Sequence, residues 1–181
     1  MTGNTLFDAC RIFKHACAFA DCAVFSEKEP ESVVVRSQQY TVPDIVNSAF
    51  ACEVFMKSIL VYNEISLDDI CKLNHGLINL WEKLRIVDNS FTTCVEMKIK
   101  DEFEIDGVEE LDELLNNVSD AFKKWRYIYE KHGGSIYIGF LRSLREILRE
   151  SCCEKIYKRT WEEYVKGDWQ WVKTQEDAEE L

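Results

Sequence analysis

The chain has 181 residues, 46% of them hydrophobic, and a formal net charge of −11 at pH 7. This length fits one domain, and the hydrophobic fraction is sufficient for a packed core, which excludes an intrinsically disordered chain. With two prolines and seven glycines, turn-rich all-β folds, collagen-like repeats and low-complexity chains are excluded as well.

Apolar side chains at three- and four-residue steps predict a first helix over about residues 5–25. A loop is expected over 32–40. Thr41 and Asp44 form a capping-box pattern, which predicts that a second helix begins there and runs over about 43–62. Because this segment is apolar nearly all round, it is predicted to be the central helix of a bundle.

Ser66 and Asp69 repeat the capping pattern ahead of a short helix, and a further helix is expected over about 77–85. Residues 88–107 show no sustained period and are expected to form an irregular crossover. A long helix is then predicted over 108–132, ended by the two glycines that follow it.

The last predicted helix covers about residues 136–154, with leucines facing the core and Arg142, Arg145 and Arg149 forming an outward basic stripe. The aromatic stretch 161–172 is expected to pack either on the core or on a second subunit. These elements predict an all-α fold, an up-and-down bundle of four to six helices.

As domain organisation we expect a single helical domain over residues 1–160, followed by an aromatic and then acidic tail over 161–181. The N-terminus lacks the basic start and apolar stretch of a signal peptide, and no apolar run approaches the roughly 20 residues that span a bilayer. Eight cysteines without a secretion signal indicate free thiols in a reducing compartment. We therefore expect a cytoplasmic protein without membrane association.

The charge is unevenly distributed along the chain. Residues 101–120 hold nine carboxylates and no Lys or Arg, whereas residues 121–160 hold ten Lys or Arg against four Glu. Because the local field decides what a surface attracts, a basic patch beside an acidic wall is compatible with a nucleic-acid partner. Two solvated helix faces of opposite sign are the alternative. A third interpretation, resting on charge alone, is that the acidic segment mimics nucleic acid or holds a basic partner.

A metal site is not expected. On a helix Cys10 and Cys17 share one face while His15 and Cys22 share another, so the four cannot meet at one ion. The adjacent pair Cys152–Cys153 rarely suits tetrahedral zinc. The cysteines are therefore interpreted as small buried hydrophobic residues, and no cofactor is expected.

Asn47, Glu53 and Lys57 interrupt the apolar surface of the predicted second helix. Glu53 and Lys57 are four residues apart and can form an internal ion pair, which is one interpretation. In the other, Glu53 orients a basic group of a functional site. His75 lies at a break between two helical segments, where a histidine is more often a capping or packing group than a catalyst.

Arg126 and His132 are the strongest candidates for chemistry. Cleavage of a phosphodiester needs a guanidinium to neutralise the pentavalent phosphorane and a histidine to move protons to or from the attacking 2′-hydroxyl or the leaving oxygen. Neither role needs a metal. Alone, an arginine six residues before a histidine is a weak pattern.

Three segments, 47–60, 75–84 and 121–130, together resemble the small bacterial HEPN-domain proteins (higher eukaryotes and prokaryotes nucleotide-binding). In these proteins a helix with a Glu and a Lys four apart precedes a His-containing helix start and a long helix ending in an Arg–His element. The resemblance covers roughly residues 5–155. It implies an up-and-down helical bundle, usually dimeric.

Many HEPN-domain proteins are metal-independent ribonucleases whose motif is an Arg, four to six residues, and then a His, commonly shared between two subunits. The resemblance thus implies a homodimeric endoribonuclease with an RNA substrate, in a toxin–antitoxin or phage-defence setting. Arg126 would stabilise the transition state, and His132 would transfer protons. A protein antitoxin or a nucleotidyltransferase is an expected partner. The accompanying residues would be Glu53 (orienting Arg126) and Asn47 as supporting groups, with Lys123, Lys124 and Arg142 as phosphate contacts.

Active members of the family usually place a small polar residue directly after the Arg, where this chain has Tyr127. Other branches are non-catalytic and bind nucleotides or partner proteins, nucleotidyltransferase antitoxins among them. The alternative expectation is therefore a non-catalytic helical dimerisation, interaction or nucleotide-binding module. In it, Trp125, Arg126 and Tyr129 would serve core and dimer packing.

Overall fold

The computed structural model describes residues 3–27, 37–73, 75–128 and 135–167, and within these ranges it contains helices and no β-strand. The all-α expectation is confirmed. The helices are α1 (Gly3–Glu27), α2 (Ser37–Tyr62), α3 (Leu67–Lys72), α4 (Leu77–Val87), α5 (Asn89–Phe103), α6 (Val108–Ser119), α7 (Ala121–Arg126) and α8 (Ile138–Tyr157). Residues 161–167 are helical as well. The described part of the chain thus has more helices than the four to six expected.

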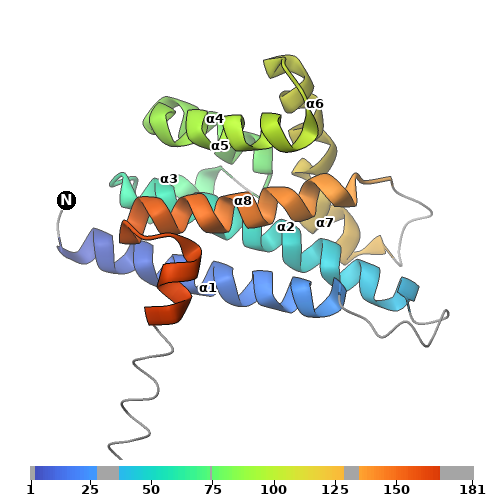
Figure 1. Ribbon diagram of the computed structural model, residues 1–181, viewed down its shortest axis with the longest axis horizontal. Coiled ribbons are helices and arrows are strands. Elements are labelled where there is room, and N and C mark those ends of the chain that lie inside the picture. The colour runs from blue at the N-terminus through green and yellow to red at the C-terminus, as the bar shows by residue number, and fades with distance from the viewer. Residues whose placement is uncertain (1–2, 28–36, 74, 129–134, 168–181) are drawn as a thin grey trace, which may run out of the picture.

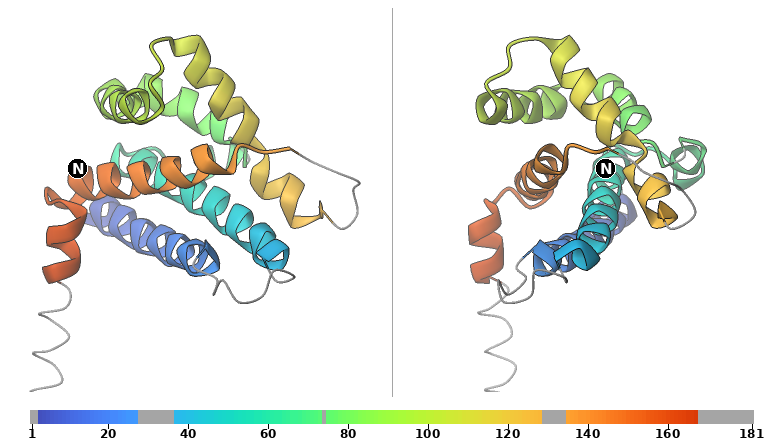
Figure 2. Two further views of the ribbon diagram at one scale, coloured as in Figure 1. Left: turned by 45° about the vertical axis from the view of Figure 1, so that its right-hand side comes forward. Right: turned by 90° about the vertical axis from the view of Figure 1, so that its right-hand side faces the viewer.

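The helices form three layers around α2 (Figures 1 and 2). α1 lies on one side of the molecule, α2 and α8 lie in the middle, and α4, α5 and α6 cover the opposite side. α2 packs against α1, α3, α4, α7 and α8, and α8 also packs against α1 and α5. The expected central helix is therefore confirmed.

The sequence of α2 explains its central place, because it presents apolar side chains in every direction. Its fully buried residues include Ala49, Cys52, Phe55, Met56 and Ile59. The helix begins earlier than expected, at Ser37, so Thr41 and Asp44 lie inside it and do not cap it. Asp44 is buried and accepts hydrogen bonds from Ser48 and Arg142, contacts that link α2 to α8.

By length and composition alone, the Thr41–Tyr62 segment of α2 could cross a membrane, and in the described ranges no other helix could. Two thirds of its most apolar window (67%) is buried inside the protein. The core helix of a bundle passes the same test, so this property by itself is a weak indication of membrane insertion.

The expectation of an irregular crossover over 88–107 is wrong, because α5 occupies most of it. Asp88 caps this helix by accepting a hydrogen bond from the backbone N–H of Phe91. Phe91, Val95 and Ile99, four residues apart, bury one narrow face of the helix. The remaining faces are polar, which weakens the periodic signal in the sequence.

The single helix expected over 108–132 is divided in the structure. α6 ends at Ser119 and α7 begins at Ala121. The buried Ser119 hydroxyl accepts a hydrogen bond from the backbone N–H of Ile78 in the first turn of α4. The two glycines expected to end this helix lie outside the described residues.

The expected outward basic stripe on α8 is wrong as well. Arg145 and Arg149 are 2% and 6% exposed, and Arg145 contacts Glu27 at 2.6 Å. Burial by itself would lower the pKa of Arg145, but hydrogen bonds to Glu146 and Glu27 raise it on balance, so the guanidinium stays charged. These arginines join α8 to α1 and α2 and do not form a surface patch.

At the C-terminal end of the described chain, Trp161 and Tyr164 pack against Phe13 of α1, with ring centroids 6.3 and 5.9 Å apart. The aromatic stretch was expected to pack either on the core or on a second subunit, and these two residues pack on the core. Trp169 and Trp171 lie outside the described residues.

Candidate functional site

Glu53 is a deeply buried carboxylate in the middle of α2, with 1% of its surface exposed. Its Oε1 accepts hydrogen bonds from Lys57 Nζ at 2.6 Å and from His75 Nδ1 at 2.8 Å. Lys57 lies one helical turn further along α2, and the packing of α4 on α2 brings His75 to the same oxygen. The internal Glu53–Lys57 pair expected from the sequence is therefore present, and it keeps the buried carboxylate from being an unpaired charge.

The second oxygen of the Glu53 carboxylate, Oε2, is buried and has no hydrogen-bond partner among the described residues. An unmet buried acceptor costs about 1–3 kcal/mol. One oxygen of the carboxylate therefore accepts hydrogen bonds from two donors, and the other accepts none from the described residues.

His75 lies in the turn before α4, and 48% of its side chain is exposed. Because an ionised carboxylate can only accept, the ring donates to Glu53 from Nδ1, and in the neutral ring Nε2 is then the basic nitrogen. The ring also packs on Phe122 of α7, with the ring centroids 5.6 Å apart. The packing role expected for His75 is present, together with a carboxylate–imidazole pair that was not expected.

Arg126, the last residue of α7, is exposed and lies on the same aromatic side chain. Its guanidinium is 5.0 Å from the centroid of the Phe122 ring and 4.6 Å from that of Tyr127. Its Nη2 donates a hydrogen bond of 2.7 Å to the Tyr127 hydroxyl. The other N–H groups of the guanidinium can bind an anion.

Phe122 thus holds together residues from three parts of the chain. It stacks on Phe50 of α2, at 4.8 Å between centroids, and contacts both His75 and Arg126. We refer to Glu53, Lys57, His75, Phe122 and Arg126 as the His75 cluster. It places an imidazole and a guanidinium against one ring.

The remaining site predictions have different outcomes. Glu53 does not orient Arg126 directly, since its hydrogen bonds go to Lys57 and His75. The guanidinium of Arg142 is bound to Asp44 at 2.6 Å, and 39% of the side chain is exposed, so its role as a phosphate contact stays a prediction.

Asn47 is half-buried on α2. Lys123 and Lys124 are exposed on α7, with Lys124 3.6 Å from Asp120. His132 lies outside the described residues.

Sequence reasoning missed the hydrogen bond between His75 and Glu53 and the contacts of Phe122 with His75 and Arg126. The segments that hold Glu53 and His75 are 22 residues apart, and only the packing of α4 on α2 brings the two side chains within hydrogen-bond distance. The histidine at a helix start and the Glu–Lys pair are visible in the sequence, but no local pattern indicates that they meet.

In the described ranges, no three His, Cys, Asp or Glu side chains converge as metal ligands. The eight cysteines are free thiols; four are buried, and Cys22, Cys71 and Cys94 are exposed, so the buried interpretation holds for half of them. Burial raises the pKa of Cys17 to about 12, which makes it a poor nucleophile.

The chain matches no protein-family model, no curated protein and no solved structure.

Proposed function

We propose that this protein is a metal-independent endoribonuclease of the HEPN type, acting in the cytoplasm as a homodimer. The observation that carries the proposal is the half-exposed His75 ring, hydrogen-bonded to buried Glu53 and lying with Arg126 on Phe122. A carboxylate that fixes the orientation of an imidazole, beside a guanidinium, is an arrangement suited to proton transfer at a phosphodiester.

In the proposed reaction the 2′-hydroxyl of the RNA attacks the adjacent phosphorus. A histidine accepts the hydroxyl proton, and a second group protonates the 5′-oxygen as the P–O bond breaks, which leaves a 2′,3′-cyclic phosphate. Arg126 neutralises the charge that develops on the phosphorane oxygens. His75 and His132 are the two proton-transfer groups, and Glu53 keeps Nε2 of His75 available by holding Nδ1.

The setting proposed for the enzyme rests on the family resemblance: a toxin–antitoxin or phage-defence system, with a protein antitoxin or a nucleotidyltransferase as partner. Exposed Lys123 and Lys124 on α7 supply phosphate contacts next to Arg126. His132 reaches the site either from the same chain or from the second subunit.

The test is a metal-free incubation of the purified protein with tRNA and a mixed RNA pool in the presence of EDTA. We expect the wild type to cleave and to leave 2′,3′-cyclic phosphate ends, and Arg126→Ala and His132→Ala to be inactive. His75→Ala should lose about 100-fold or more in rate, the usual contribution of a general acid or base. His15→Ala is the matched control, because His15 is exposed on α1 outside the cluster, and it should keep the full rate.

The outcomes separate the parts of the proposal. Cleavage by Arg126→Ala at the wild-type rate would show that the assignment is wrong. If Arg126→Ala and His132→Ala are inactive while His75→Ala keeps the full rate, the nuclease activity is supported and the proton-transfer role of His75 is wrong. No cleavage by a folded, dimeric wild type would favour a non-catalytic module.

The alternative function is such a non-catalytic dimerisation, interaction or nucleotide-binding module. It is favoured by the contacts of Arg126 with the Phe122 and Tyr127 rings, which are packing interactions. In this case Arg126→Ala should lower the melting temperature or the dimer fraction, and there is no cleavage activity to lose.

A further inference from the structure

The outward side of α1 is a helix face that no described element covers. α1 packs against α2 and α8 with its inner side and forms an outer layer of the molecule (Figures 1 and 2). The side chains of the outward face recur at steps of three and four residues, which places them in one line along a helix. They are all exposed, and we refer to them together as the α1 stripe: Phe7, Arg11, Lys14, Ala18, Cys22 and Phe25.

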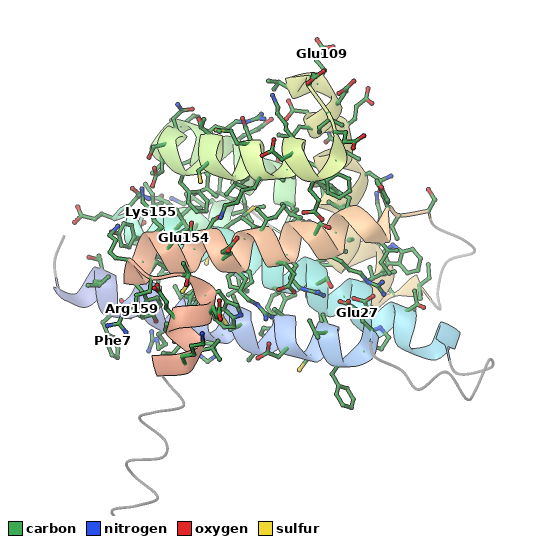
Figure 3. All side chains as sticks on the ribbon, in the orientation of Figure 1. Phe7, Glu27, Glu109, Glu154, Lys155 and Arg159 are labelled. Carbon is green, nitrogen blue, oxygen red and sulfur yellow. The ribbon has the colours of Figure 1, made fainter. Side chains whose placement is uncertain are left out.

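Two large aromatic side chains lie at the ends of the α1 stripe. Phe7 is 66% exposed and Phe25 is 79% exposed. Figure 3 shows Phe7 at the N-terminal end of the helix, at the edge of the molecule. One exposed phenylalanine is common on a protein surface. Two on the same helix face, about five turns apart, bound a stripe about 27 Å long that a second helix of the same length can cover.

The α1 stripe is complementary to itself about a two-fold axis. In a two-fold interface, residue i of one copy contacts residue j of the other, and j contacts i. When two α1 helices lie antiparallel with their Ala16 residues level, Phe7 of each copy meets Phe25 of the other, because both are equally far from Ala16 along the chain. The two rings also lie at the same angle around the helix, since a whole number of turns separates them.

The charges match in the same arrangement. Arg11 and Asp21 are also equally far from Ala16, so the guanidinium of each copy lies level with the Asp21 carboxylate of the other. The two side chains are 59% and 67% exposed. Within its own chain, Arg11 pairs with Asp8 through Nη2, and Asp21 pairs with Arg149 through Oδ1. Arg11 therefore keeps further N–H donors, and Asp21 keeps a second oxygen, for contacts between copies.

The middle of the α1 stripe permits close contact. Ala18 has a side chain of one methyl group, so the two helix axes can approach to the lower part of the range of about 8–10 Å seen for packed helices. Lys14 is level with Ala18 of the other copy, and Asp21 of that copy lies about one turn further on. Each Lys14 ammonium group can therefore reach an opposite carboxylate, which offsets the repulsion between the two ammonium groups.

We propose that a second copy of this chain binds through the α1 stripe, with the two α1 helices antiparallel about a two-fold axis. The inference deepens the proposed function, on which the expectation of a homodimer rests, by naming the interface. One helix from each copy makes a contact at the low end of specific interfaces, below about 1,200 Å² in total. The dimer is therefore expected to dissociate on dilution. The α1 stripe shares no residue with the His75 cluster.

Sedimentation velocity of the full chain over a range of concentrations measures the equilibrium between monomer and dimer. We expect the wild type to dimerise. Ala18→Arg places a long cation at the middle of the interface, beside Lys14 of the other copy, and should raise the dissociation constant of the dimer about tenfold or more. Because Ala18 is exposed, the change spares the fold, which circular dichroism checks. Ile86→Arg is the matched control: Ile86 is 80% exposed on α4, the variant gains the same charge, and it should dimerise as the wild type does.

Cross-linking tests the antiparallel register. In a chain whose exposed Cys22, Cys71 and Cys94 are replaced by serine, Phe7→Cys and Phe25→Cys are prepared separately, one of them labelled with ¹⁵N. The two are mixed and oxidised mildly with copper phenanthroline. The mixture should give disulfide-linked dimers with one chain of each kind. Phe7→Cys or Phe25→Cys alone should give far fewer, because about 27 Å along the helix separates like residues across the two-fold axis.

Several outcomes would contradict the proposed interface. A wild type that stays monomeric at every concentration would show that no second copy covers the α1 stripe. The proposal is also wrong if Ala18→Arg dimerises as tightly as the wild type, if Ala18→Arg and Ile86→Arg weaken the dimer equally, or if like residues cross-link as efficiently as unlike ones. None of these measurements reads RNA cleavage, so a failure of the interface and a failure of the proposed nuclease are distinguished.

Discussion

Among single residues, Asp88 makes several contacts that no pattern in the surrounding sequence predicts. Its carboxylate caps α5 through Phe91 N–H at 3.2 Å, accepts a hydrogen bond from Asn63 at 3.0 Å, and pairs with Lys155 of α8 at 2.7 Å. Burial by itself would raise the pKa of Asp88, but hydrogen bonds from Lys155, Ser90 and Asn63 outweigh it and lower the pKa.

This lowered pKa makes the stability of the protein depend on pH in a defined direction. A carboxyl group whose pKa is lower in the folded state stabilises the fold above its unfolded pKa, near 3.9, and the contribution is lost as the pH falls through the folded value. We expect Asp88→Asn, which can still cap the helix but carries no charge, to be less stable than wild type at pH 7. Urea unfolding should show that the difference in the free energy of unfolding between the wild type and Asp88→Asn becomes smaller as the pH is lowered from about 4.

Asp88→Ala is the companion variant, because it removes the cap and the ion pair together. It should lose about 1–2 kcal/mol for the cap alone, in addition to the loss seen for Asp88→Asn. If the difference in the free energy of unfolding between the wild type and Asp88→Asn stays constant down to acid pH, the charge of Asp88 does not stabilise the fold.

At the element scale, the sequence predicts helices where one broad apolar face repeats, and misses them where the buried face is narrow. α1, α4 and α8 are expected within about three residues of their observed ends, whereas α2 begins six residues before its expected start. α5 buries few side chains per turn and is expected to be irregular. Its capping residue, Asp88, is the available signal, since an acidic N-cap ahead of residues with a four-residue spacing predicts a helix start.

The candidate site is predictable only in part, for a related reason. Glu53, Lys57 and Arg126 are singled out by residue type, but the hydrogen bond between Glu53 and His75 depends on how α4 packs on α2. The outward orientation expected for Arg145 is wrong for a similar reason. Steps of three and four residues place Arg142, Arg145 and Arg149 on a shared helix face, and arginine usually lies in solvent. Here Glu27 and Asp44 on neighbouring helices make a buried guanidinium tolerable.

The ion pairs of α8 give a prediction for that element. Arg145 is 2% exposed, contacts Glu27 at 2.6 Å and lies 3.8 Å from the buried Asp44 carboxylate. Arg145→Met removes this counter-charge from both carboxylates and should cost about 3 kcal/mol in the free energy of unfolding. Arg142→Met is the matched variant on the same helix. Arg142 is 39% exposed, but it is the nearest cation to the buried Asp44 carboxylate, at 2.6 Å, so its loss should cost a similar amount.

Chemical denaturation of the two variants and the wild type measures both costs. A much smaller loss for Arg142→Met would show that exposure of the guanidinium, and not burial of its carboxylate partner, sets the energetic importance of these pairs. A more stable Arg145→Met protein would show that the desolvation of the charges outweighs their attraction, as happens in some buried networks.

Across the whole molecule, the outer part of the acidic segment lies away from α7, although its last carboxylate, Asp120, is 3.6 Å from Lys124. Glu109 of α6 lies at the outer tip of the α4–α6 layer (Figure 3), whereas Lys123 and Lys124 are on α7, which packs against α2. A net charge of −11 therefore does not describe the field near Arg126.

The separation can be tested on the proposed ribonuclease by the salt dependence of RNA binding. Each cationic side chain that contacts a phosphate of single-stranded RNA contributes about 0.7 to the slope of log binding constant against log salt concentration. If Lys123 and Lys124 both make such contacts, Lys123→Gln/Lys124→Gln should lower the magnitude of the slope by about 1.4. Fluorescence anisotropy with a labelled single-stranded RNA measures it.

The double variant Lys72→Gln/Lys166→Gln is the control, because both lysines are exposed, pair with acidic neighbours on their own helical segments, and lie outside α7. The two double variants carry the same net charge. If net charge governed RNA binding, both would shift the slope equally; if the local field of α7 governs it, only Lys123→Gln/Lys124→Gln changes the slope. Equal shifts in the two variants would remove α7 from the proposed RNA-binding surface, and with it the argument that Arg126 is approached by a phosphate.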